Sequence, residues 1–128
     1  MAVAAMLNAK KEDILCVRGN CDSEIDQVVL EFPMMAECVI LSVGKKMIFA
    51  THGHRFNTKT PPPLHEGDIL LHGHTHIPVL EDRGAYILAN PGSVTLPKQN
   101  SARGYLLLED GSMIYKTLEG VSEKSLQL

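Results

Sequence analysis

Residues 69–76 read ILLHGHTH, an apolar run followed by a polar loop that contains glycine and histidine. The run has the length and composition of a buried strand. Residues 46–54, KMIFATHGH, repeat the arrangement earlier in the chain. In extended backbone residues i and i+2 point the same way, so each histidine pair is expected to converge. Neutral imidazole binds Mn, Fe, Zn, Ni and Cu, and the two pairs therefore predict a metal site at strand ends.

Outward from these loops, the sequence predicts mostly strands, with helices near the N-terminus. A glycine turn or an Asp-Gly pair separates several apolar runs, as in β-hairpins. The expected elements are a helix over 1–11, a buried strand over 14–17, a helix over 24–30 with Asp22 or Ser23 as N-cap, hairpins over 38–50, 79–88 and 105–115, and a polar tail from Gly120.

Length and composition restrict the class of protein. The chain has 128 residues, 45% hydrophobic and 21% charged, which predicts one folded domain over residues 1–128. A net charge of -3 without a basic stripe argues against a nucleic-acid partner. No apolar run is long enough to cross a bilayer, and no secretory signal is evident, so we expect a cytoplasmic protein without a membrane partner. Three widely spaced cysteines predict free thiols.

Asn20 follows the apolar run at 14–17 and has two interpretations. Asn tolerates turn conformations, so it can be an ordinary turn residue. Its side-chain oxygen can also bind a metal ion. Taken without the histidines, the turn is the simpler interpretation; with them, the ligand role gains weight.

These motifs occur in one order along the chain: RGNCD at 18–22, THGH at 51–54, GHTH at 73–76 and NPGS at 90–93. The sequence resembles the calcineurin-like metallophosphoesterases, and within them the small bacterial and archaeal phosphodiesterases. The resemblance implies an α/β fold, a partial α/β/β/α sandwich. It also implies an enzyme, a dinuclear-metal phosphodiesterase in which a metal-bound hydroxide attacks a small-molecule phosphodiester.

The resemblance assigns roles to individual residues. Asn20, His52 and His74 would bind one metal ion and His76 the other, with Mn²⁺ expected and Zn²⁺, Fe²⁺ or Ni²⁺ as alternatives. The expected catalytic group comprises Cys21, Asp22 and His54. His54 would lie beside the metal ligands, either supporting them or facing the phosphate, and Cys21 stands where many relatives have a leaving-group histidine. A small turn residue is an equal interpretation of Cys21. His65 and His72 match no motif and are expected at the surface or in packing.

The sequence departs from the family at its start. An Asp-x-His-Gly motif and the following Gly-Asp motif, which supply metal-binding aspartates, are not found; Asp68 in Gly67-Asp68 comes too late and is read as a loop residue before a strand. We therefore expect the C-terminal two thirds of the family domain, truncated at the N-terminus and lacking the first two strands, with impaired activity. The sheet edge exposed in this way predicts a homodimer. The alternatives are a non-catalytic scaffold on the same fold and a simple metal-binding remnant.

Overall fold

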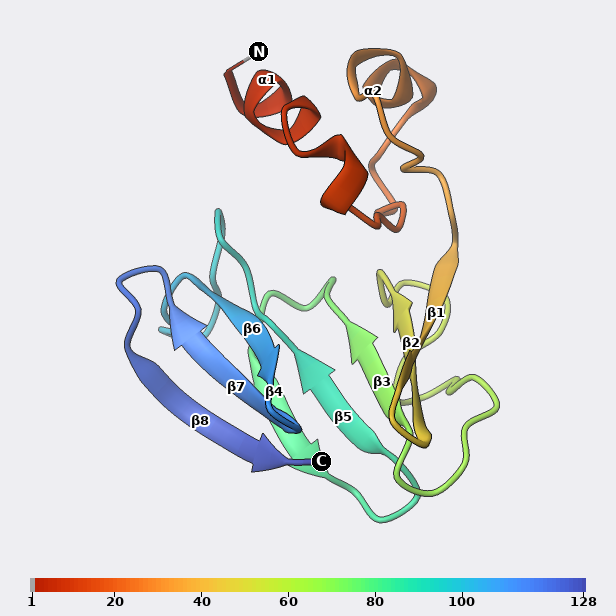
Figure 1. The fold of residues 1–128 in the computed structure, drawn as a ribbon, viewed down its shortest axis with the longest axis vertical. Coiled ribbons are helices and arrows are strands. Elements are labelled where there is room, and N and C mark those ends of the chain that lie inside the picture. The colour runs from red at the N-terminus through yellow and green to blue at the C-terminus, as the bar shows by residue number, and fades with distance from the viewer. Residues whose placement is uncertain (1) are drawn as a thin grey trace.

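The computed structural model describes residues 2–128, which form a mixed α/β fold dominated by strands (Figure 1). Helix α1 (Ala2–Asn8) and a short 3₁₀ turn (Lys11–Asp13) precede helix α2 (Glu24–Val29). The strands that follow are β1 (Cys38–Val43), β2 (Lys46–Thr51), β3 (Ile69–His72), β4 (Val79–Asp82), β5 (Ile87–Asn90), β6 (Gly104–Glu109), β7 (Ser112–Thr117) and β8 (Ser122–Gln127).

The strands form two sheets. The larger has the order β1-β2-β3-β5-β4, in which β2, β3 and β5 run parallel and the outer strands antiparallel. The smaller is the antiparallel meander β6-β7-β8. Both helices lie beyond one end of the sheets, on the side where β3 and β5 end (Figure 1). The ends of the parallel strands are therefore the part of the sheet nearest to the N-terminal segment.

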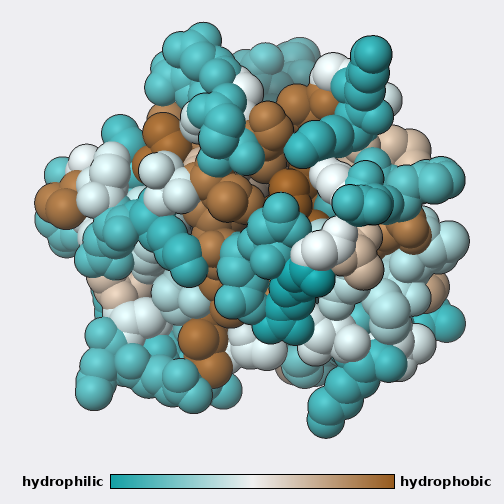
Figure 2. All heavy atoms as spheres, turned by 90° about the horizontal axis from the view of Figure 1, so that it is seen from below, coloured by the Kyte–Doolittle hydropathy of each residue, from teal (hydrophilic) through white to brown (hydrophobic). Residues whose placement is uncertain are grey.

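The core lies between the two sheets. Ile48, Ile69 and Ile87 from the larger sheet are buried in one cluster with Met113 from β7. Burial of such aliphatic side chains is the main contribution to folding, roughly 1.5–3 kcal/mol for each. Figure 2 shows apolar groups reaching the surface in the middle of the face seen from below, with polar groups around them.

Most predicted elements are confirmed. The three hairpins are present as β1–β2, β4–β5 and β6–β7, and β3 follows Asp68, which is a loop residue as expected. Helix α2 begins after Ser23, whose backbone N–H donates to the Asp26 carboxylate in a capping box. The predicted first helix is shorter than expected, and its Met1 lies outside the described residues.

Two predicted elements are wrong. Residues 14–17 are extended but belong to no strand, and Leu15 is 69% exposed. An apolar run becomes a buried strand only when a neighbouring strand pairs with it. None of the described residues forms a strand that pairs with residues 14–17. The predicted polar tail is instead strand β8, which pairs with β7. Its polar side chains are exposed at the sheet edge, so its sequence carries no apolar alternation.

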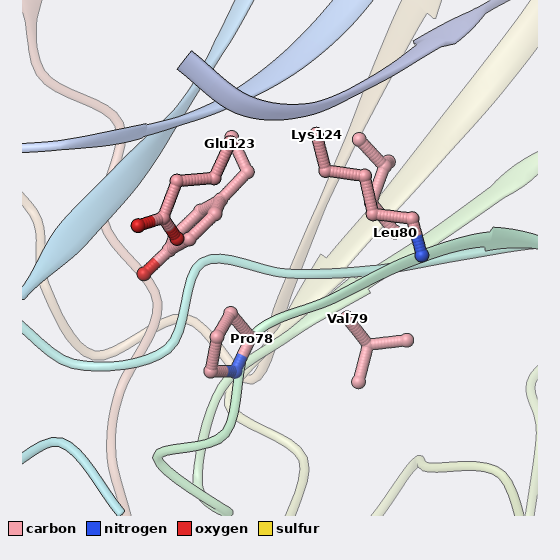
Figure 3. Close-up of a pocket in the computed structure, with 6 residues that line it drawn as sticks. Pro78, Val79, Leu80, Glu123 and Lys124 are labelled. Atoms are coloured by element: carbon pink, nitrogen blue, oxygen red, sulfur yellow. The ribbon is translucent and has the colours of Figure 1, made fainter. Parts of the chain in front are cut away.

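The two sheets meet where β4 approaches β8 (Figure 3). An opening of about 240 Å³ lies there, between Pro78, Val79 and Leu80 on one side and Glu123 and Lys124 on the other. It contains none of the motif histidines. Among residues 2–128, neither of the α-helices is long and apolar enough to span a membrane.

Candidate metal centre

The two histidine loops are neighbours because β2 and β3 end together. The strands are parallel, with Thr51 opposite His72, and the backbone N–H of Gly73 donates to the His52 carbonyl at 2.8 Å. This bond continues the ladder one residue beyond the strands. The carboxyl ends of parallel strands are the usual location of sites in α/β sheets.

Three predicted ligands converge at this point. His52 Nε2 lies 2.9 Å from Asn20 Oδ1 and 3.1 Å from His74 Nδ1. Two ligand atoms at right angles and about 2.1 Å from one ion are about 3.0 Å apart. The separations therefore fit adjacent ligands of a single metal ion. Asn20 is thus not an isolated turn residue but part of the histidine cluster.

His76 and His54 lie beside this trio. His76 lines the same surface opening as His52 and His74. Its Nδ1 is 2.8 Å from the Leu96 carbonyl, which requires the proton on Nδ1 and leaves Nε2 as the lone-pair nitrogen. The His54 ring centroid is 5.4 Å from that of His52 and 6.4 Å from that of His74. All four predicted histidines therefore gather at one edge of the sheet.

The loop that carries His74 and His76 is not extended, contrary to the expectation from the i, i+2 spacing. Their φ angles are +67° and +61°, in the left-handed region that non-glycine residues rarely adopt. The convergence of the histidines comes from this turn. Such backbone persists where the surroundings hold it, and it is concentrated at functional sites.

Asn90 holds the turn and was not recognised as a site residue from the sequence. Its side chain is buried, 1% exposed, at the end of β5. The amide donates to the Gly73 carbonyl and to Thr75 Oγ1, and its oxygen accepts the N–H of Gly92. The NPGS motif contains the signal, but the partners of a buried amide depend on the three-dimensional fold.

The pKa of His52 is lowered, mainly because burial disfavours the imidazolium and also because His74 and His54 lie close by. Burial of the His72 imidazole likewise lowers the pKa of that residue. Neutral imidazole is the form that binds metal ions, so the surroundings of His52 favour the metal-binding form.

The predicted catalytic residues Cys21 and Asp22 flank the Asn20 turn. Cys21 is exposed with a free thiol. The Asp22 carboxylate accepts the Gly19 N–H at 2.7 Å, and its carbonyl accepts Arg18 Nε–H. Asp22 therefore stabilises the turn on which Asn20 is placed.

The other histidines are located as predicted. His72 is buried, and its Nδ1 lies 2.9 Å from the Gly73 carbonyl. A Cβ at Gly53, whose φ is +113°, would lie 2.8 Å from His72 Nδ1, so only glycine fits there. The imidazole of His65 is at the surface.

The acidic part of a dinuclear centre is not present in the described residues. Over residues 2–128, no group of three or more His, Cys, Asp and Glu side chains is arranged to hold a metal ion. The converging trio contains only two residues of these types, His52 and His74, because its third member is Asn20. The donors present suit one divalent ion bound by amide oxygen and imidazole nitrogen.

A family model of the calcineurin-like phosphoesterase superfamily domain matches residues 2–112. The chain belongs to this superfamily. Phosphodiesterase YfcE of Escherichia coli K12 is 44% identical to this chain over 108 residues. These residues are 84% of this chain and 59% of YfcE. The probable metallophosphoesterase YsnB of Bacillus subtilis is 28% identical over 104 residues, or 76% of the chain and 57% of that relative. The chain thus spans about three fifths of the length of these curated relatives.

The fold of this superfamily member also matches a solved relative. The structure of YfcE, a phosphoesterase from E. coli, aligns with a TM-score of 0.95 at 36% identity. The alignment covers 98% of this chain and 70% of the YfcE chain. The metallophosphoesterase fold predicted from the ordered motifs is confirmed.

Proposed function

We propose that this chain carries the asparagine and histidine part of a metal-dependent phosphodiesterase site. The observation that carries the proposal is the convergence of Asn20 Oδ1 and His74 Nδ1 on His52 Nε2, at separations of 2.9 and 3.1 Å. Calcineurin-like phosphoesterases depend on metal ions, and YfcE is named a phosphodiesterase. The proposed substrate is therefore a small-molecule phosphodiester.

Asn20, His52 and His74 would bind one divalent ion, and His76 would contribute to a second. Mn²⁺ is the proposed ion, since it accepts oxygen and imidazole donors. A bound divalent ion supplies charge neutralisation at the phosphoryl oxygens and activates water at neutral pH. The chain's own contribution is to orient the imidazoles, through the Leu96 carbonyl for His76 and through Asn90 for the loop of His74.

The predicted catalytic residues have different positions in this proposal. The His54 ring, beside those of His52 and His74, would face the phosphate. Cys21 is exposed next to Asn20 and would assist the leaving group. Asp22, whose carboxylate already accepts the Gly19 N–H, would act mainly by keeping the Asn20 turn in place.

The test is Mn²⁺-dependent hydrolysis of bis(4-nitrophenyl) phosphate by the chain, by its His74→Ala variant and by a His65→Ala control. His65 is a matched control because its imidazole is at the surface, outside the cluster. We expect turnover to fall at least about 100-fold in His74→Ala and to be unchanged in His65→Ala. Equal turnover in all three would contradict the assignment.

A second candidate function is a metal-binding remnant without catalysis, and a specific observation favours it. The described residues place no carboxylate among those that line the histidine opening. Mn²⁺ binding, measured by calorimetry and lost in His74→Ala, without any turnover would support this second function. The absence of both binding and turnover would exclude both.

We also propose that the chain forms homodimers through β1. This strand is an outer strand of the larger sheet, and Ile40 on it is 57% exposed. Its sequence, CVILSV, contains no charge or proline that would prevent pairing with another chain. Sedimentation velocity should detect a dimer that Ile40→Lys weakens, and a wild-type chain that remains monomeric at high concentration would refute the proposal.

A further inference from the structure

The histidine cluster opens onto a surface hollow of about 400 Å³. The imidazoles of His52, His74 and His76 form one side. The loop after β5 and the start of β6, which include Val94 and Tyr105, also line the hollow. None of the described residues that line the hollow is Lys, Arg, Asp or Glu.

Two of the lining residues have apolar groups that the core does not use. Val94 is 54% and Tyr105 39% exposed. The two lie at the same hollow although they come from different elements. An aromatic and an aliphatic side chain left exposed beside a polar site are typical of a ligand wall.

This wall is held in place by the fold. The Ser93 hydroxyl accepts the N–H groups of Thr95 and Leu96, which fixes the turn that carries Val94. Tyr105 is on β6, paired with Lys116 of β7. The preceding Gly104 packs so closely on β7 that a Cβ would lie 2.5 Å from the Lys116 carbonyl. The tyrosine therefore has a defined position relative to the imidazoles.

We propose that Tyr105 and Val94 determine specificity by binding an aromatic ester group of the phosphodiester, while the histidine side receives the phosphoryl group. This inference rests on the proposed function and adds the class of substrate. A phosphomonoester carries two charges and no second organic group, whereas a diester carries one charge and two organic groups. A hollow lined by histidines and apolar side chains, without cationic side chains among its described lining residues, matches the diester.

The test compares two stable, singly charged phosphonate esters, ethyl phenylphosphonate and ethyl methylphosphonate. They differ only in the carbon group bonded to phosphorus, and the phenyl ring stands in for the aromatic ester group. Their dissociation constants are measured by calorimetry with Mn²⁺ present, so the readout is binding and not turnover. The wild type should bind the phenyl compound about five- to tenfold more tightly, because the ring is buried against Tyr105. The preference should disappear in Tyr105→Ser and remain in Tyr105→Phe.

The matched control is Tyr86→Ser. Tyr86 immediately precedes β5, at the opposite end of that strand from the site. This variant should keep the full preference for the phenyl compound. Circular dichroism spectra that match the wild type establish that each variant is folded.

The outcomes separate the inference from the function on which it rests. If both esters bind but with equal affinity, or if Tyr105→Ser keeps the preference, the aromatic wall is refuted and the phosphodiesterase proposal is unaffected. If neither ester binds in the presence of Mn²⁺, both proposals fail. A ring preference that only Tyr105→Ser abolishes supports the inference.

Discussion

Replacing Asn90 by alanine tests how much stability depends on the buried amide that links the loop of His74 and His76 to the turn at Gly92. The substitution removes three hydrogen bonds: those to the Gly73 carbonyl, to Thr75 Oγ1 and from the Gly92 N–H. A buried hydrogen bond contributes about 1 kcal/mol net, and an unsatisfied buried group costs about 1–3 kcal/mol.

The three bonds are not equal. The Gly73 carbonyl keeps the Thr75 N–H as a donor and has His72 Nδ1 at 2.9 Å. Losing the bond from Asn90 to this carbonyl therefore costs little. The exposed Thr75 hydroxyl can turn to water. The half-buried Gly92 N–H is left without a protein partner and dominates the cost. Together these terms predict that Asn90→Ala lowers the free energy of unfolding by about 2 to 3 kcal/mol.

The assay is equilibrium urea denaturation of the metal-free chain at pH 7, followed by circular dichroism. An unchanged denaturant slope would show that the variants unfold by the same two-state process. Asn57→Ala is the matched control, since Asn57 also makes three hydrogen bonds, two of them to the exposed N–H groups of Lys59 and Thr60.

Water replaces the two hydrogen bonds with the exposed N–H groups of Lys59 and Thr60. We therefore expect Asn57→Ala to lower the free energy of unfolding by less than about 1 kcal/mol. The reasoning is refuted if the two variants lose the same free energy within about 0.5 kcal/mol.

Further predictions concern stability and can be measured in the same way. Asp68→Asn should lower the free energy of unfolding by about 1–3 kcal/mol at pH 7, because the carboxylate accepts two backbone N–H bonds that lower its pKa; this advantage is present above about pH 4 and is lost as the pH falls through the lowered pKa, so a difference that does not shrink as the pH falls would contradict it. Gly104→Ala should lower the free energy of unfolding by at least about 2 kcal/mol, because the alanine Cβ would meet the Lys116 carbonyl; a urea midpoint equal to that of the wild type would refute the close packing. Leu15→Ser should change stability by less than about 0.5 kcal/mol, because Leu15 is exposed; a large loss would indicate that it is buried.

The fold could be predicted where local signals and long-range pairing agree. The turn at Asp110-Gly111 joins two apolar runs, and the hairpin β6–β7 follows. At residues 14–17 the apolar run is evident, but whether it becomes a strand depends on a partner that local sequence cannot specify. Strand β8 shows the opposite case. It is polar because it is an exposed edge, and its backbone pairing with β7 leaves no trace in the hydrophobic pattern.

The sequence indicated which side chains gather at the candidate site but not which residues support them. Asn20, His52 and His74 stand in motifs whose order indicated the family, and their side chains meet. The role of Asn90 could not be predicted, because a buried amide has no periodicity and its partners come from other loops. The wall formed by Val94 and Tyr105 is also a product of tertiary structure, since its residues come from separate elements.

The arrangement explains why the ligands are attached to loops and yet have defined positions. The backbone bond from Gly73 to the His52 carbonyl extends the rigid ladder of β2 and β3 to the first histidine. Beyond it, the left-handed turn is intrinsically unfavourable, so it needs compensation from outside the loop. Asn90, at the end of the neighbouring parallel strand, links the turn to that strand by donating to the Gly73 carbonyl and to Thr75 Oγ1. The geometry of the ligands therefore depends on three adjacent parallel strands and not on the histidine motifs themselves.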